Sequence, residues 1–178
     1  MQTLDRDELS IHVDAPTREL YALVSDVTRT PQFSPEIVEC VWLDGATGPR
    51  VGARFEATNA VGRGRQWKNR PVVTVADPGL EFAFARTEPL AGTVVWRYRV
   101  EPEDGGTRIT ESYEVTRPIT RLGWFVIERI YGCGDRRAEL RAGMQQTLER
   151  IRATAEQDFS SAAADEPAIE DHRSEAPS

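Results

Sequence analysis

Residues 80–115 read LEFAFARTEPLAGTVVWRYRVEPEDGGTRITESYEV, and this stretch decides the fold. Three runs within it, residues 80–86, 93–101 and 107–115, alternate apolar and polar side chains as half-buried β-strands do. The segment Glu103–Gly106 carries the Asp-Gly signal of a tight turn between the last two runs. Links this short can join antiparallel strands but not parallel ones. The stretch therefore predicts three neighbouring strands of an antiparallel sheet.

Similar runs extend the sheet toward the N-terminus. Residues 38–43 (VECVWL), 54–59 (RFEATN) and 65–75 (RQWKNRPVVTV) are rich in β-branched and aromatic residues, and turn signals begin at Asp44 and Asp77. Six consecutive strands with short links predict an antiparallel meander.

The residues before this meander predict one more strand and two helices. Apolar and polar residues alternate from Glu8 to Val13, which indicates a strand with His12 facing outward. Residues 16–25 suit a helix, with Asp14 as a possible cap and a proline in the first turn. The repeated breaks in SDVTRTPQFSPEI predict a short second helix.

The chain after Pro118 predicts a long helix from Thr120 to about Gln157. Gly132 and Gly134 each cost about 1 kcal/mol relative to alanine inside a helix, so we expect a break there and the strongest helix from about Asp135. The apolar stripe at spacings of three and four consists of Leu140, Met144, Leu148, Ile151 and Ala155.

These elements predict an α+β fold in which a curved antiparallel sheet of about seven strands wraps around the long helix, with two short helices after the first strand. A curved sheet and one straight helix leave space between them, so we expect an internal apolar cavity. Strand parity places large side chains on its concave face: Trp67, Val73, Val75, Phe82, Phe84, Val94, Trp96, Tyr98, Ile109, Glu111 and Tyr113.

Charge divides the chain into a domain, residues 1–157, and an acidic tail, residues 158–178. The net charge is −7, of which the tail contributes −5 through six acids and one arginine. The tail has few large apolar residues, so we expect it to be disordered, with an interaction peptide as the alternative. The domain carries only −2 and no basic footprint, which argues against nucleic acid as a partner.

The N-terminus and the cysteines exclude several classes of protein. Charges stand in MQTLDRDELS where a secretory signal needs an apolar core, and no stretch approaches the roughly 20 apolar residues of a membrane span. We therefore expect a cytoplasmic protein without integral membrane association. Cys40, Cys133, His12 and His172 lack metal-ligand spacing, so no metal and no cofactor is expected.

The order of elements and three strings resemble the START-like (SRPBCC) superfamily, specifically its bacterial polyketide cyclase/dehydrase and lipid-transport branch. The strings are LYALVSDVTRTPQFSPEI, DPGLEFAFA and GMQQTLERIRATAE, and the likeness runs from about Glu8 to Gln157. The resemblance implies the helix-grip fold and a cavity that holds lipids, polyketides or other apolar metabolites. It does not imply one reaction, because the branch contains both cyclases and carriers.

The aromatic residues of the concave face are the candidate ligand-binding residues, since flat rings hold apolar molecules and tyrosine hydroxyls orient them. Simple core packing is the alternative for each of them. The candidate set is Trp67, Phe82, Phe84, Trp96, Tyr98, Glu111, Tyr113 and Met144.

Glu111 is the candidate catalytic acid. Burial would raise the pKa of its carboxyl, which could then act as a general acid or base in an aldol cyclisation or dehydration, with Tyr98 or Tyr113 holding the substrate carbonyl. Two alternatives remain open: the register is off by one and Glu111 faces water, or Glu111 pairs with Arg86.

Other polar residues have structural explanations. Asp26 and Glu36 stand where residues cap helices or stabilise turns. Arg63, Arg65, Lys68 and Arg70 form either a solvated strand face or a site for an anionic head group.

Three functions follow, in order of support. The first is binding of a small hydrophobic ligand without chemistry, by a monomer or homodimer. The second is a polyketide cyclase or dehydratase that acts through Glu111 or Tyr113. The third is an interaction module with a filled core. No nucleophilic elbow, phosphate-binding loop or dinucleotide motif is present in the sequence.

Overall fold

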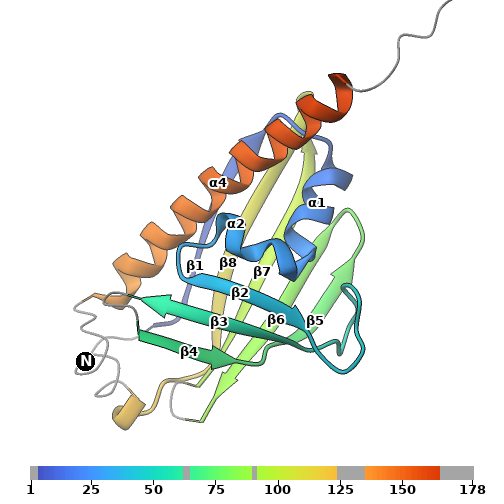
Figure 1. Cartoon of the computed structure of the whole chain (residues 1–178). Helices are drawn as coiled ribbons and strands as arrows, with labels where there is room; N and C mark the ends of the chain where they lie inside the picture. Colours follow the sequence, from blue (N-terminus) through green and yellow to red (C-terminus); the bar gives the residue numbers. More distant parts are fainter. Residues whose placement is uncertain (1–3, 62–64, 90–91, 124–134, 165–178) are drawn as a thin grey trace, which may run out of the picture.

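The computed structural model describes residues 4–61, 65–89, 92–123 and 135–164. A large antiparallel sheet, a long C-terminal helix and short helices after the first strand confirm the predicted fold class (Figure 1). The elements are β1 (Arg6–Val13), α1 (Thr17–Ser25), the 3-10 helix η1 (Val27–Arg29), α2 (Thr30–Phe33), β2 (Ile37–Trp42), β3 (Phe55–Val61), β4 (Arg65–Asn69), β5 (Val72–Asp77), β6 (Glu81–Glu88), β7 (Gly92–Glu103), β8 (Gly106–Arg117) and α4 (Arg136–Ala164).

The strands form two antiparallel groups, in the orders β1-β8-β7-β6-β5 and β2-β3-β4. The single run predicted at residues 65–75 is two strands, because Arg70 and Pro71 separate β4 from β5 and proline has no N–H for a ladder. Backbone hydrogen bonds still join the groups: Val73 N–H donates to the Ala53 carbonyl at 2.8 Å. Figure 1 shows β2, β3 and β4 crossing the long strands steeply, which folds the sheet over its own inner face.

The first strand closes on the last, a pairing that a plain meander lacks. Leu9 of β1 stands opposite Glu111 of β8. The β7–β8 turn has positive φ angles at Asp104 (29°) and Gly105 (82°), as the Asp-Gly signal predicts.

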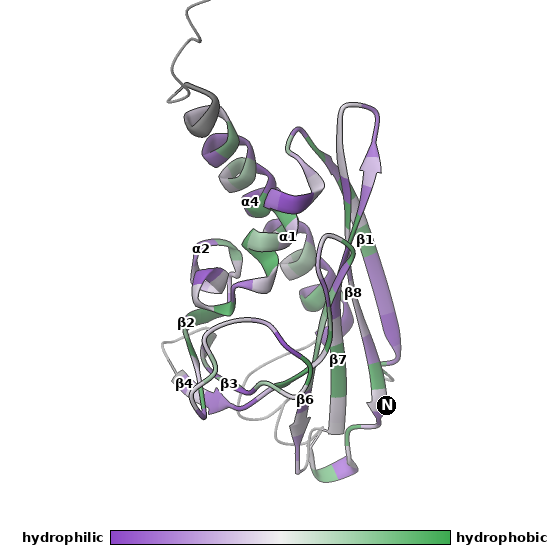
Figure 2. Cartoon of the chain, turned by 90° about the vertical axis from the view of Figure 1, so that its right-hand side faces the viewer, coloured by the Kyte–Doolittle hydropathy of each residue, from purple (hydrophilic) through white to green (hydrophobic). Residues whose placement is uncertain are grey.

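The helices cover one face of the long strands (Figure 2). The apolar stripe of α4 faces the core as predicted, and Leu140, Met144, Leu148, Ile151 and Ala155 are all buried. Among the helices that the structure describes, none is long and apolar enough to span a membrane.

Two predicted details of the helices differ in the structure. Pro16 occupies the N-cap position of α1 without a side-chain cap, so the role expected of Asp14 was wrong; its carboxylate contacts His12 at 3.0 Å instead. Helix α4 continues to Ala164, past the expected domain end at Gln157, because its last residues are alanines with high helix propensity. Residues 165–178 of the expected tail and the expected break at Gly132 and Gly134 lie outside the described residues.

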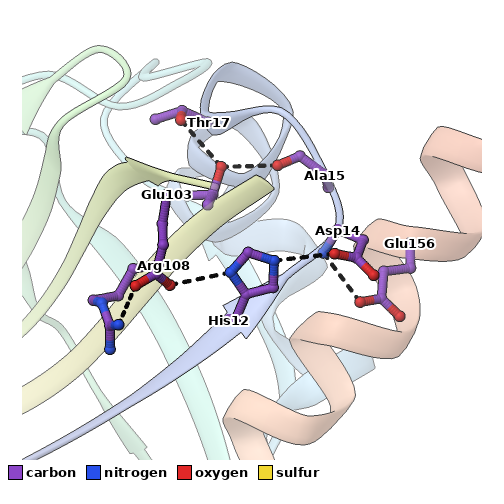
Figure 3. A network of polar contacts seen from close by, with 8 residues as sticks. His12, Asp14, Ala15, Thr17, Glu103, Arg108 and Glu156 are labelled. Carbon is purple, nitrogen blue, oxygen red and sulfur yellow. Dashed lines mark hydrogen bonds and ion pairs between the residues drawn. The ribbon is translucent and has the colours of Figure 1, made fainter. Parts of the chain in front are cut away.

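His12 faces outward as predicted and joins three elements (Figure 3). Its ring nitrogens contact Glu103 at the end of β7 and Asp14, each at 3.0 Å. The backbone N–H of Asp14 in turn donates to Glu156 of α4 at 3.1 Å. The network therefore ties the β7–β8 end of the sheet to the long helix.

Protonation of His12 should stabilise the fold. The hydrogen bonds to Glu103 and then to Asp14 raise the pKa of His12 above its ordinary value of 6.5. Its stabilising contribution is thus complete below pH 6.5 and is lost as pH rises through the folded-state pKa. An NMR titration should place the His12 midpoint above 6.5, and Glu103→Gln should lower it. A midpoint unchanged by that substitution would contradict the network.

Candidate functional site

A cavity of about 100 Å³ lies between the inner face of the sheet, the short helices and α4. Alternate residues of β6, β7 and β8 form the sheet side of the cavity, since residues two apart on a strand point to the same face. Its apolar walls include Val24, Val27, Phe55, Phe82, Phe84, Trp96 and Met144, and its polar lining includes Glu36, Asn59, Asn69, Arg86, Tyr98, Glu111, Arg136 and Thr147.

The cavity brings together six of the eight candidate residues: Phe82, Phe84, Trp96, Tyr98, Glu111 and Met144. The β6–β7 register places these residues side by side across the sheet: Phe82 stands opposite Tyr98, and Phe84 stands opposite Trp96. The inner-face parity predicted for these strands is therefore confirmed.

Trp67 and Tyr113 do not line the cavity. Trp67 stands opposite Asn59, which does line it, so Trp67 shares the inner face but lies beyond the described pocket. Tyr113 is 2% exposed and packs its ring 5.4 Å from that of Trp96, in a core cluster with Leu140 and Met144. Its position was predicted from parity, but the packing around it closes it off from the cavity.

Glu111 faces the cavity at its buried end. Tyr98 stands opposite Glu111 across β7 and β8, and its hydroxyl donates to Glu111 Oε1 at 3.0 Å. Glu111 is 3% exposed, and its Oε2 has no hydrogen-bond partner among the described residues. The water-facing alternative is therefore excluded, and no ion pair joins Glu111 to Arg86 in the part of the chain that the structure describes.

Burial raises the pKa of Glu111 from its ordinary 4.5 to about 8, and the hydrogen bond from Tyr98 only partly opposes this. The carboxyl is thus mainly protonated at neutral pH. A neutral carboxyl with one free oxygen can donate a hydrogen bond to a bound carbonyl or exchange a proton with it.

The opposite end of the cavity carries charge. Arg136 Nη1 and Nη2 lie 3.3 and 3.5 Å from the two carboxylate oxygens of Glu36. Their side chains are 15% and 30% exposed, so this end is closer to solvent than Glu111. Arg86 lines the same end and makes no hydrogen bond or ion pair with the residues described here.

Several lining residues were missed by the sequence analysis. Asn69 has a buried Oδ1 without a partner, and parity with Trp67 could have placed it on the inner face. Arg86 shares parity with Phe82 and Phe84, yet it was considered only as a partner of Glu111. Arg136 is 100 residues from Glu36, and no local signal predicts that contact.

The remaining candidates have structural roles. Asp26 caps η1 by accepting the Thr28 N–H at 3.0 Å, as predicted. Lys68 and Arg70 both contact Glu56, at 2.7 and 3.1 Å, so these two members of the basic cluster are paired with a carboxylate. Arg63 and the side chain of Arg65 lie outside the described residues.

Comparisons with known proteins agree with this fold. The family model described as polyketide cyclase / dehydrase and lipid transport matches residues 8–156. A solution structure of a polyketide-cyclase-like protein from Corynebacterium glutamicum is 35% identical, with 90% of this chain and 96% of that chain covered and a TM-score of 0.60. No curated protein matches the chain.

More distant structures share the fold alone. The di-domain ARO/CYC StfQ from the steffimycin biosynthetic pathway is 16% identical, with 87% of this chain and 51% of that chain covered and a TM-score of 0.68. The major latex-like protein 151 from Panax ginseng is 13% identical, with 84% and 96% covered and a TM-score of 0.62.

Proposed function

Because this chain belongs to the polyketide cyclase / dehydrase and lipid transport family of the START-like superfamily, we propose that it binds a small hydrophobic ligand in the cavity. The observation that carries the proposal is an unfilled space walled by Phe82, Phe84 and Trp96 inside a packed core. Protein interiors are normally close-packed, so a space with aromatic walls and polar groups gathered at its two ends is typical of a ligand site.

The size of the cavity limits the ligand. A volume of about 100 Å³ is of the order of the roughly 150 Å³ cavity that accepts benzene in an engineered protein. One ring or a short chain fits without movement of the walls. Burial of roughly 200 Å² of apolar ligand surface gives about 5 kcal/mol before association costs, so we expect micromolar or weaker binding.

Filling the cavity from α4 tests the proposal. Gly143 lines the cavity, and a Cβ added there meets only Pro35 Cγ at an ordinary 3.9 Å. Gly143→Leu should abolish the fluorescence enhancement of a solvatochromic apolar dye. Gly143→Ala is the matched control: it should retain the dye and raise the free energy of unfolding by about 1 kcal/mol, because alanine favours the helix.

Mass spectrometry of small molecules released on denaturation is the second readout. Wild-type protein should release an apolar molecule that Gly143→Leu lacks. If the folded leucine variant binds dye as well as wild type, or if wild type neither binds dye nor releases a molecule, the cavity is not a ligand site. In that case the interaction-module hypothesis regains support.

A second candidate function, cyclisation or dehydration of a keto compound, is favoured by the Tyr98–Glu111 pair. A carboxyl with a pKa of about 8 can take a proton from carbon next to a carbonyl and return it to a leaving hydroxyl. Glu111→Gln should then keep dye binding while conversion of a small poly-β-ketone falls at least about 100-fold. Equal conversion by both proteins leaves binding as the function.

A further inference from the structure

Arg86 is a partly buried cation at the charged end of the cavity, without an adjacent counter-ion among the residues that the structure describes. Its guanidinium lines the cavity, and it makes no hydrogen bond or ion pair with any residue that the structure describes. Burial, followed by the nearby charge of Arg136, lowers the pKa of Arg86 below its ordinary value, and the charges of Glu88 and Glu36 only partly oppose this. Arginine nevertheless stays charged in proteins. A partly buried guanidinium without an adjacent counter-ion can bind an anionic group of a ligand through its N–H groups.

The other ionisable groups of the cavity make no ion pair with Arg86 in the described part of the chain, although Glu36 lies near enough to oppose part of the shift in its pKa. Glu36 is engaged by Arg136, with two N···O distances of 3.3 and 3.5 Å. Glu111 is mainly neutral at pH 7. Among the described charged side chains that line the cavity, Arg86 therefore has no carboxylate within ion-pair distance.

The position of Arg86 suits one end of an elongated ligand. The inner face of β6 carries, in order along the strand, Phe82, Phe84 and Arg86. Phe82 stands opposite Tyr98, which in turn stands opposite Glu111, so these three residues form one row across the sheet. Arg86 therefore stands about 13 Å along the strand from that row. The aromatic walls lie between a cation at the exposed end and a neutral carboxyl at the buried end.

We infer that the ligand is an apolar carboxylic acid, bound as its carboxylate by Arg86 with its ring or chain between Phe84 and Trp96. The fork of N–H groups on one guanidinium matches the two oxygens of a carboxylate. This inference rests on the proposed function, because it specifies what the same cavity binds.

A pair of compounds that differ only in the anionic group tests the inference. Binding of 3-phenylpropanoate and 3-phenylpropan-1-ol at pH 7 is measured by NMR chemical-shift titration. Wild type should prefer the acid about 10- to 100-fold, as expected for hydrogen bonds to charged groups. Arg86→Met should lose this preference and still bind the alcohol. Arg99→Met is the matched control and should behave as wild type. Arg99 lies on β7, is exposed and contacts Glu81 of β6.

Thermal unfolding gives a readout independent of any ligand. Arg86→Met should raise Tm by roughly 2–4 °C, because it removes a partly buried charge that has no adjacent counter-ion among the described residues. Arg99→Met should not raise it. If the methionine variant precipitates, Arg86→Gln replaces it, and this variant should likewise lose the preference for the acid over the alcohol.

The outcomes separate this inference from the function on which it rests. Equal binding of acid and alcohol by wild type, or an acid preference that survives in Arg86→Met, overturns the carboxylate site and leaves apolar binding intact. Failure of both compounds to bind wild type overturns the carboxylate site as well. Dye binding by the Gly143 variants then decides whether the cavity binds any apolar molecule.

Discussion

Replacement of Glu111 by glutamine is expected to remove a pH dependence of stability of about 5 kcal/mol between pH 4.5 and pH 8. The cause is the rise in the pKa of the buried carboxyl from 4.5 to about 8 on folding. Each pH unit in this window corresponds to about 1.4 kcal/mol. A typical domain is stable by only about 5–15 kcal/mol, so this is a large fraction of the total.

The sign follows from the direction of the shift. Below pH 4.5 Glu111 is protonated in both states, and its contribution to stability is complete. As pH rises above 4.5, Glu111 ionises first in the unfolded chain, which lowers the free energy of the unfolded state, so the stability of the folded protein falls until about pH 8. Glutamine has no such transition, and its amide can still accept the hydrogen bond from Tyr98.

Denaturant unfolding from pH 4 to pH 9 measures this effect. The difference in free energy of unfolding between Glu111→Gln and wild type should grow with pH in favour of the variant and level off above pH 8. Glu149→Gln, an exposed glutamate on α4, is the control and should track wild type. Parallel curves for Glu111→Gln and wild type would show that Glu111 is ionised in the folded protein.

Phe33→Ala is expected to cost about 3–5 kcal/mol of stability. Phe33 is 0% exposed, belongs to α2 and packs in the main core cluster. It does not line the cavity, so its removal creates a new void in close-packed surroundings. Because α2 leads directly into Ser34 and Pro35 of the cavity wall, ligand binding should weaken as well.

Phe159→Ala provides the matched control. Phe159 lies on α4 and is 42% exposed, so the same truncation there should change the free energy of unfolding by no more than about 0.5 kcal/mol. Chemical denaturation of both variants at one pH gives the comparison. A loss below about 1 kcal/mol in Phe33→Ala would mean that α2 is not anchored by this side chain.

Local periodicity predicted most of the fold and most of the cavity floor. The period of two on β6, β7 and β8 placed Phe82, Phe84, Trp96, Tyr98 and Glu111 on one face, and the structure confirms each position. The stripe on α4 likewise predicted the buried face of the helix. Such patterns are readable because side-chain direction along one element depends only on backbone geometry.

The contacts between elements had no such local signal. Parity placed Tyr113 beside Glu111, yet packing against Trp96 excludes it from the cavity. The pairing of Arg136 with Glu36 joins residues far apart in the chain, and it engages a carboxylate that would otherwise be available to Arg86.

The sequence by itself therefore determined the fold class, the inner faces of β6, β7 and β8 and the carboxyl that faces the cavity. On β5 the prediction was wrong for Val75, because a register shift after Val73 sets Val75 opposite Ala83 on the outer face. Only the tertiary structure decided which inner-face residues reach empty space, which charges are paired and how large the cavity is. The physical reason is that burial, pairing and residual volume depend on what lies opposite each side chain. That neighbour comes from another element, whose placement no local pattern encodes.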